Sequence, residues 1–577
     1  MGCLVSQEIR PSKVELMKRT SGRLRGTIGA ELTAPTSHFG DADHQLLKFH
    51  GIYEGFDRDT ATTLKQSGAE KDYGFMVRVK VPAGHMTAAQ YLTLDALAQR
   101  YGGGKLRITT REALQFHGVA KRALRATVAA INAALLTTFG ACGDVVRNVT
   151  ATPAPIADAV HRRLQADARM LAAALVPRTR AYHEIWVDGA PSGDAEPEDE
   201  PLYGPTYLPR KFKIGLASPD DNWIDVLTND LGIIALFDGE RLTGYNLALG
   251  GGLGMTHNKP KTYPRLATPL VFVGPDALLD AVKGVIALQR DHGDRADRKH
   301  ARLKYLLDAK GLAWAKATLE GYLGRPLADA RPMPPFRVRD HMGWHAQGDG
   351  RWYFGLPVAS GRIVDRDGHR LATALRRIFT ELAITPIFTP TQDILIAEVA
   401  EADRARVDAL LVEHGVPLPQ HQTPVRRWAL ACPALPSCGL ALTEAERVRE
   451  PIIDGIEAAL RRHGLIDERI SIRITGCPNG CARPYAGDIG IVGRMPGFFA
   501  IFLGGDFEGT RLNAKIFDRV ALADIAGVLE PLFAQFASAR APGESFGDFC
   551  ARLGPEALRA CVDAALPARE RALRHSA

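Results

Sequence analysis

The stretch TGCPNGC at residues 475–481 decides the fold of this chain, together with Cys432 and Cys438 upstream. It places four of the eight cysteines in a Cys-x5-Cys pair and a Cys-x3-Cys pair, each beside proline or glycine. Gly480 tolerates positive φ, so the turn inside the second pair can direct backbone N–H groups toward sulfur. This arrangement is typical of thiolates that together hold one polynuclear metal centre.

The segment between the two pairs predicts a helix. Thr443 and Glu446 form a capping-box pattern at its start, and Gly464 follows a basic last turn at its end. Its apolar residues keep helical spacing: Ile452, Ile453, Ile456 and Leu460. We expect this helix to carry the chain from one cysteine pair to the other.

Three interpretations of the cysteines compete. A structural zinc site more often has Cys-x2-4-Cys spacing with a shorter gap between the pairs. Disulfides are not expected in a chain without a signal peptide whose other four cysteines stand singly. An Fe-S cluster fits the spacing best, and it predicts a protein that transfers electrons.

The composition is that of a globular protein, with 46% hydrophobic and 24% charged residues among 577. This length indicates about three or four domains. No apolar run reaches roughly 18 residues, because the best candidate, at 270–288, is interrupted by proline and charged residues, so we expect no membrane span. We expect the protein in a reducing cytoplasm, where a thiolate-bound cluster persists.

A formal net charge of +7 raises the question of nucleic acid. The basic residues are interspersed with acidic ones and form no tract or nucleic-acid-binding motif, so we expect no nucleic-acid partner. An internal polyanionic ligand accounts for the excess equally well. The first six residues, MGCLVS, fit the N-myristoylation pattern, but no polybasic patch follows, and we interpret Cys3 as a surface thiol.

Cations share single faces of predicted strands. The alternation of residues 75–81 places Arg78 and Lys80 on one face, and the local pattern alone indicates a solvated face. Lys211 and Lys213 likewise share one face of a predicted strand.

A predicted helix at 88–101 leads into a donor-rich segment at 106–118. Its donors share faces of two adjoining predicted strands: Arg107, Thr109, Arg111, Gln115 and His117. Because five donors converge on a short segment, we predict an anion cradle here.

Two further patterns concern the backbone and the architecture. The run GGGLG at 250–254 fits neither the dinucleotide-binding nor the Walker motif, and we interpret it as a tight turn that lets the backbone approach a ligand closely. Residues 389–396 echo 109–116, and 472–474 echo 146–148. These echoes predict a duplicated architecture.

Several of these motifs, in this order, resemble those of the sirohaem sulfite and nitrite reductases. The cluster region carries the resemblance first, through ACPALPSC at 431–438, TEAER at 443–447 and the turn at 475–481. It extends over nearly the whole chain, through LRGTI at 24–28, FHG at 49–51, YLPRKFK at 207–213 and GESFGDF at 543–549. Within the family, the likeness is greatest to the haemoprotein (β) components of NADPH-dependent assimilatory sulfite reductases.

The resemblance implies an α+β fold of three domains, with pseudo-twofold duplicated halves around a sirohaem and a [4Fe-4S] cluster. Residues 1–75 would form an N-terminal extended arm. Residues 76–140 and 345–419 would form a split ferredoxin-like (parachute-type) domain from two related repeats. Residues 141–344 would bind sirohaem and substrate, and residues 420–577 would bind the cluster and sirohaem.

The resemblance also assigns roles to individual residues. The cluster ligands would be Cys432, Cys438, Cys477 and Cys481, and Cys481 would also be the axial ligand of the sirohaem iron. The substrate-binding residues would be Arg78, Arg147, Lys211 and Lys213. The residues that contact the sirohaem carboxylates would be Arg107, Thr109, Arg111, Gln115, His117, Arg210 and Arg302.

The implied activity is the six-electron reduction of sulfite to sulfide. The chain carries no nicotinamide or flavin fingerprint, so its electrons must come from another protein. The resemblance indicates an NADPH-dependent flavoprotein with FAD and FMN, and ferredoxin is the other donor that we consider.

Two alternatives stay open. The first is a sirohaem nitrite reductase: Lys213 and the sequence 433–437 favour sulfite, whereas Gly439 is a departure toward the nitrite branch. The second belongs to a different class, a zinc-stabilised protein that uses its positive charge to bind nucleic acid.

Overall fold

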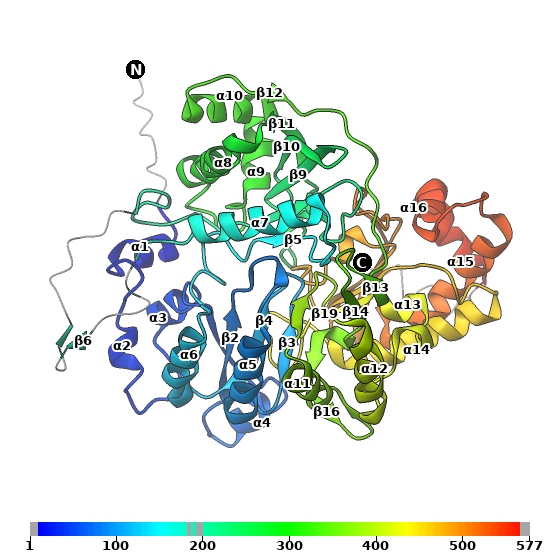
Figure 1. Ribbon diagram of the computed structural model, residues 1–577, viewed down its shortest axis with the longest axis horizontal. Helices are drawn as coiled ribbons and strands as arrows, with labels where there is room; N and C mark the ends of the chain where they lie inside the picture. The colour runs from blue at the N-terminus through cyan, green and yellow to red at the C-terminus, as the bar shows by residue number, and fades with distance from the viewer. Residues whose placement is uncertain (1–9, 180, 182–185, 188–189, 192–199, 566–577) are drawn as a thin grey trace.

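The computed structural model describes residues 10–179, 181, 186–187, 190–191 and 200–565. Its elements form an α+β molecule with four principal sheets, each covered by helices (Figure 1). Two small ribbons complete the strands: β6 (Trp186–Val187) with β7 (Ala190–Pro191), and β16 (Asp365–Arg366) with β17 (His369–Arg370). In the part of the chain described, no helix is long and apolar enough to cross a membrane.

The first sheet is antiparallel, in the order β1-β2-β4-β3-β15. Its strands are β1 (Ile52–Phe56), β2 (Tyr73–Val79), β3 (Leu106–Ile108), β4 (Leu114–Val119) and β15 (Arg362–Ile363). The associated helices are α5 (Ala88–Tyr101) and α6 (Leu124–Ala133). Because β15 comes from a segment far along the chain, this sheet already joins two regions of the sequence.

The second sheet, in the order β13-β14-β19-β18, repeats this pattern. Its strands are β13 (Gly343–Ala346), β14 (Trp352–Leu356), β18 (Thr385–Phe388) and β19 (Ile394–Val399), with helices α11 (Leu371–Leu382) and α12 (Arg404–Glu413). One hydrophobic core contains residues of both sheets, and within it the rings of Tyr91 and Phe379 lie 4.9 Å apart. The two segments therefore fold around a common interior.

The echo between residues 109–116 and 389–396 corresponds to one recurring turn. The amide of Thr109 donates to Ala113, and the amide of Thr389 donates to Asp393, at 2.9 and 3.0 Å. In each turn the residue before the acceptor has positive φ. The same local geometry thus precedes β4 and β19.

The third sheet has the order β12-β11-β10-β9-β8-β5. Its strands are β5 (Thr150–Ala151), β8 (Ile214–Ala217), β9 (Leu231–Asp238), β10 (Arg241–Leu249), β11 (Thr268–Val273) and β12 (Ala328–Asp329). The accompanying helices are α7 (Ala159–Ala174), α8 (Leu278–His292), α9 (Leu303–Lys310) and α10 (Leu312–Leu323).

The fourth sheet, β20-β21-β22-β23-β24, has the same strand directions as β5-β8-β9-β10-β11: two parallel pairings, then two antiparallel ones. Its strands are β20 (Ala429–Ala431), β21 (Ile472–Thr475), β22 (Ile489–Met495), β23 (Phe498–Leu503) and β24 (Ala514–Ala521). Its helices are α13 (Pro424–Arg427), α14 (Arg449–Arg462), α15 (Ile525–Ala539) and α16 (Phe546–Ala565). Both types of sheet therefore occur twice, which is the duplication that the sequence predicts.

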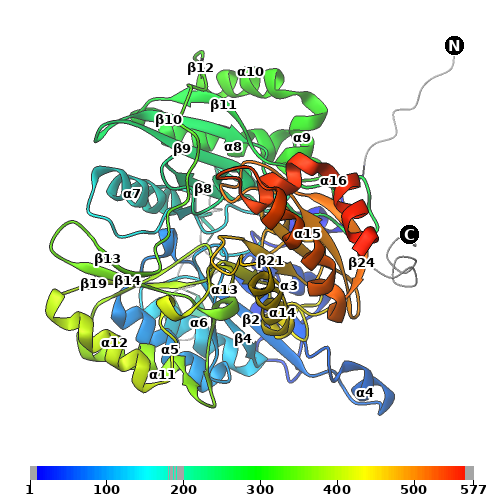
Figure 2. The same ribbon diagram turned by 90° about the vertical axis from the view of Figure 1, so that its right-hand side faces the viewer.

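The N-terminal region differs from an extended arm. Residues 10–75 contain α1 (Lys13–Thr20), α2 (Ile28–Glu31), α3 (Asp41–Leu46) and α4 (Ala61–Gln66), and β1 pairs with β2 in the first sheet. Figure 2 shows the whole molecule turned by 90° from the view of Figure 1.

Candidate functional site

The cysteine pairs meet because two of their members follow neighbouring parallel strands. Cys432 follows β20 and Cys477 lies just beyond β21, so both lie at the carboxyl edge of the sheet. The amide of Gly476 donates to Cys432 Sγ at 3.4 Å, and Asn479 Nδ2 donates to Cys477 Sγ at 3.4 Å. The turn residues thus direct N–H donors toward sulfur, as predicted for this stretch.

The charge of Cys481 affects the ionisation of the other three thiols. Burial raises the pKa of Cys432 and Cys438 and raises that of Cys477 to about 12, and in each case the charge of Cys481 raises it further. Clustered thiolates repel one another, and a cationic centre between them stabilises the deprotonated form.

A single zinc ion does not suit this arrangement. Tetrahedral zinc with Zn–S bonds of about 2.3 Å holds its sulfurs about 3.8 Å apart. Among the described residues, no group of three or more His, Cys, Asp or Glu side chains is arranged to hold one metal ion. The Cys-x5-Cys and Cys-x3-Cys spacing favours a polynuclear centre over the zinc alternative.

The glycine run at 250–254 lies against the cluster turn. The amide of Met255 donates to the carbonyl of Pro478 at 2.9 Å, and a Cβ on Gly254 would lie 3.2 Å from the carbonyl oxygen of Asn479. Buried Lys304 fixes this loop, since its Nζ donates to the carbonyls of Gly252 and Gly254 at 2.9 and 3.1 Å. The close backbone approach predicted from the glycines is therefore made to the cluster turn.

The predicted helix between the cysteine pairs is present as α14, but the capping box is wrong. The Thr443 hydroxyl accepts from the amide of Gly497 at 3.0 Å, and the Glu446 carboxylate binds Arg107 and Arg362. Tertiary contacts take both side chains away from the helix terminus. Arg107 also donates to the carbonyl of Ala431 at 2.7 Å, beside Cys432.

Replacing Glu446 by glutamine should lower stability at pH 7 more than at pH 3. Despite burial, the two guanidinium groups lower the pKa of Glu446 from 4.5 to about 2. The ionised carboxylate therefore contributes about 3 kcal/mol to the free energy of unfolding. This contribution is fully present above about pH 4.5 and is lost as the pH falls toward 2. Urea unfolding midpoints of both proteins at the two pH values measure this.

The control is Glu401→Gln, which removes an exposed ion pair with Arg404 and should change the midpoint little. An equal loss of stability by Glu446→Gln at pH 7 and pH 3 would contradict the ionised state of Glu446.

The four cations predicted to bind substrate lie in β2 and in the segments that lead into β5 and β8. Arg78 lies in β2 opposite Gln115 of β4, and with the Gln115 amide oxygen turned toward it, its Nε donates at 2.7 Å. The amide of Arg147 donates to the carbonyl of Phe212 at 2.9 Å, which places it beside Lys211 and Lys213.

The lysines lie in a strongly cationic environment. Burial lowers the pKa of Lys211 well below its usual value, and four cations lower it further: Arg210, Lys213, Arg302 and Arg147. Burial lowers the pKa of Lys213 to about 7, with Arg111 and Arg302 acting in the same direction. The charge of Cys481 acts on Lys213 in the opposite direction, so the cation cluster and the cysteine cluster adjoin.

Several side chains of the predicted anion cradle form hydrogen bonds within the folded chain. Arg111 donates to the carbonyl of Ile214 and to Asn229 Oδ1, each at 2.9 Å, while its buried Nε has no partner among the described residues. Thr109 Oγ1 accepts from two amides of its own turn, and His117 Nε2 lies 3.2 Å from Gln115. Donors held by the backbone in this way are preorganised for an anionic ligand, and the anion cradle stays a prediction.

Arg210 and Arg302 lie at the edge of the same site, and each lies beside a carboxylate. Arg302 Nε donates to Asp230 at 2.7 Å, and Arg210 lies 3.9 Å from Asp144. Asp230 also accepts from the amide of Lys213 at 2.8 Å. The structure thus gathers the predicted residues around one cationic region bordered by Cys481.

Sequence reasoning missed several residues of this site. Tyr53 hydrogen-bonds to Arg147, and Asp230, Asp144 and Glu446 each bind a predicted cation. Only Tyr53 had a nearby signal, since it follows the motif at 49–51 by two residues. The carboxylates belong to no local motif.

Fold and site together define a redox protein that can hold a thiolate-bound metal cluster beside an anionic ligand. Comparisons with known proteins agree. The nitrite and sulphite reductase 4Fe-4S domain matches residues 166–327 and 426–569, and the nitrite/sulfite reductase ferredoxin-like half domain matches 68–134. The chain therefore belongs to the nitrite and sulfite reductase family.

Relatives match almost end to end. The protein named sulfite reductase [ferredoxin] of Synechococcus elongatus is 44% identical over 95% of this chain and 90% of its own length. The sulfite reductase [NADPH] hemoprotein beta-component of Myxococcus xanthus is 45% identical over 95% of this chain and 98% of its own. The predicted family and the [4Fe-4S] cluster are thereby confirmed.

The fold class is confirmed by a solved structure. The Mycobacterium tuberculosis NirA protein superposes with a TM-score of 0.79 at 22% identity, covering 95% of this chain and 98% of that one. At this identity the likeness establishes the fold, including its duplicated halves.

Proposed function

We propose that this chain is the sirohaem-containing haemoprotein of an assimilatory sulfite reductase, which reduces sulfite to sulfide with six electrons. The observation that carries the proposal is the position of Lys213, which lies close enough to the guanidinium groups of Arg111 and Arg302 and to Cys481 for all three to affect its pKa. The names of the relatives, which match over 95% of the chain, support sulfite as the substrate.

The cofactors suit the residues present. The four cysteines of the two pairs would hold the [4Fe-4S] cluster, with Cys481 shared with the sirohaem iron. The buried cations repel one another, and an anion with several carboxylates, such as sirohaem, relieves that repulsion. The proposed carboxylate-binding residues are Arg107, Thr109, Arg111, Gln115, His117, Arg210 and Arg302. When bound, the two cofactors supply the electron storage that no side chain provides.

The substrate residues divide into fixed charges and proton donors. The guanidinium groups of Arg78 and Arg147 would hold the sulfite oxygens. Despite burial, contact with Tyr53 raises the pKa of Arg147. Lys213, with a pKa of about 7, can release the proton that a departing oxygen needs to leave as water. Lys211, whose pKa is also lowered, would act in the same way.

The electrons would come from a separate protein. Relatives named after NADPH and after ferredoxin both match this chain, and we propose an NADPH-dependent flavoprotein carrying FAD and FMN, with ferredoxin as the alternative donor. A thiolate-bound cluster is compatible with the cytoplasm. The domain limits predicted from the sequence complete the proposal: 1–75, 76–140 with 345–419, 141–344 and 420–577.

The visible absorption spectrum of the purified chain, with iron, zinc and acid-labile sulfide analysis, tests the function. We expect a haem-like Soret band with bands in the red, and about five irons and four sulfides per chain, from one sirohaem and one [4Fe-4S] cluster. A colourless zinc protein from cells able to make sirohaem would contradict it. Nitrite and sulfite assays with reduced methyl viologen then compare the two anions.

A further inference from the structure

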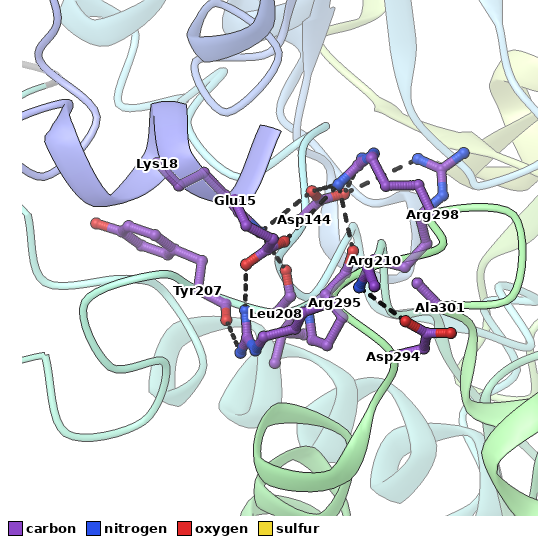
Figure 3. Close-up of polar contacts among 12 residues, drawn as sticks. Glu15, Lys18, Asp144, Tyr207, Leu208, Arg210, Asp294, Arg295, Arg298 and Ala301 are labelled. Carbon is purple, nitrogen blue, oxygen red and sulfur yellow. Dashed lines mark hydrogen bonds and ion pairs between the residues drawn. The ribbon is translucent and has the colours of Figure 1, made fainter. Parts of the chain in front are cut away.

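Three consecutive carbonyls next to the substrate lysines are each held by a buried or partly buried cation. Lys18 Nζ donates to the carbonyl of Leu208 at 2.8 Å, Arg295 to that of Tyr207 at 2.8 Å, and Arg298 to that of Pro209 at 3.3 Å. Figure 3 shows these side chains converging on the 207–210 segment. Lys18 comes from α1, near the N-terminus, whereas the two arginines follow α8.

Carboxylates tie these cations together. Glu15 of α1 binds both Lys18 and Arg295, and Asp144 binds Arg298 at 2.8 Å and lies 3.6 Å from Lys18. The side chains of Glu15, Lys18 and Asp144 are at most 4% exposed. Ion pairs this deeply buried are geometrically demanding, because an unpaired charge there is strongly unfavourable.

The network reaches the two segments that carry Arg147, Lys211 and Lys213. Residues 207–209 directly precede Arg210 and Lys211 in sequence, and Tyr207 has φ of +56°, an uncommon conformation for a tyrosine. The amide of Leu208 donates to the carbonyl of Asp144 at 3.0 Å, three residues before Arg147. Lys18 therefore contacts a backbone segment whose neighbours on two sides are proposed substrate ligands.

We propose that Glu15 and Lys18 of α1 are positioning residues for the sulfite site, fixing the backbone from which Lys211 and Lys213 project. The inference rests on the proposed function. α1 contacts no reacting group itself; it acts through the Leu208 carbonyl and through Asp144. Without this contact the 207–213 segment gains freedom, and a displacement of about 1 Å at a reacting centre can lower a rate about 100-fold.

The test uses the full-length holoenzyme with Glu15→Gln and Lys18→Met combined. Removing both charges together leaves no new unpaired charge between them, which is often nearly neutral for stability. We expect the sirohaem bands and iron content of the wild type, with KM for sulfite raised about 10- to 100-fold. Lys18→Arg as a single change should stay close to the wild-type KM, because it keeps the positive donor.

The matched control is Lys13→Met on the same helix. Lys13 forms only an exposed ion pair with Asp41, at 3.8 Å, so this variant should keep the wild-type KM. Should the double variant fail to fold, the nearly isosteric Glu15→Gln alone should still raise KM. A wild-type KM in a folded double variant, or in folded Glu15→Gln where the double variant does not fold, would overturn the positioning role. Absence of sirohaem bands from the wild type would instead overturn the proposed function.

Discussion

Cys477→Ser should yield a protein without the metal cluster and without sulfite reduction. Cys477 is buried beside Asn479 and Gly476, and its thiol is one of four whose charges act on one another. A serine hydroxyl remains protonated at neutral pH and is a poor ligand for iron compared with thiolate. We expect iron to fall from about five per chain to about one or less, and activity to fall to background.

The control for this experiment is Cys561→Ser. Cys561 lies in α16, is partly buried beside Pro531 of α15, and belongs to neither cysteine pair. It should keep full iron, full sulfide and wild-type activity. Retention of four sulfides per chain by Cys477→Ser would show that Cys477 is not a ligand.

Lys213→Asn should lower sulfite reduction by about 100-fold or more, and nitrite reduction by less. The substitution removes a buried amine whose pKa, about 7, suits it to proton transfer at neutral pH. It also removes a positive charge, which a dianion requires more than a monoanion does. Steady-state rates with both anions measure the difference, and equal losses would show that Lys213 does not discriminate between them.

The pH profile provides a second measurement on Lys213. If its protonated amine is required, kcat/KM for sulfite falls as the pH rises through the amine's pKa, which lies at about 7 in the chain alone and higher beside anionic cofactors. Lys213→Asn should remove this alkaline decline. Lys299→Asn, the same change at an exposed lysine, should leave both the rates and the profile unchanged.

Local sequence patterns predicted the parts of the fold that local forces determine. The helix expected at 88–101 is α5, with those bounds, because Thr87 and Gln90 form a capping box and Gly102 follows the last turn. The echo between residues 109–116 and 389–396 identified the duplication, because each repeat uses the same turn before its strand. The other features of the fold class were predicted from the resemblance of several motifs to those of the family.

Side-chain environment was harder to predict than secondary structure. Arg78 lies in β2, and Lys80 directly follows this strand. The interpretation of their shared face as solvated is wrong for Lys80, which is 5% exposed and has its pKa lowered to about 8 by burial. Alternation reports which residues share a face; it does not report what covers that face. The cover here comes from other segments of the chain.

The partners of the predicted cations were beyond the reach of local patterns for the same reason. Thr443 and Glu446 satisfy the capping-box rule, yet Glu446 forms ion pairs with Arg107 and Arg362. Asp144 and Asp230 are single carboxylates without a motif, and only the folded chain shows that each holds a cation of the site. Nonlocal electrostatics of this kind overrides local propensity.

The contact between Arg107 and Glu446 spans 339 residues of sequence, and this affects how the protein can be made. A ribosome that adds about 5 to 20 residues per second needs on the order of 20 to 70 s to proceed from one residue to the other. During that interval the nascent N-terminal half carries a guanidinium group without its carboxylate, and the second cysteine pair, Cys477 and Cys481, has not been synthesised. The four proposed cluster ligands are complete only once Cys481 has been made, so cluster assembly has to wait until both duplicated halves have been largely synthesised.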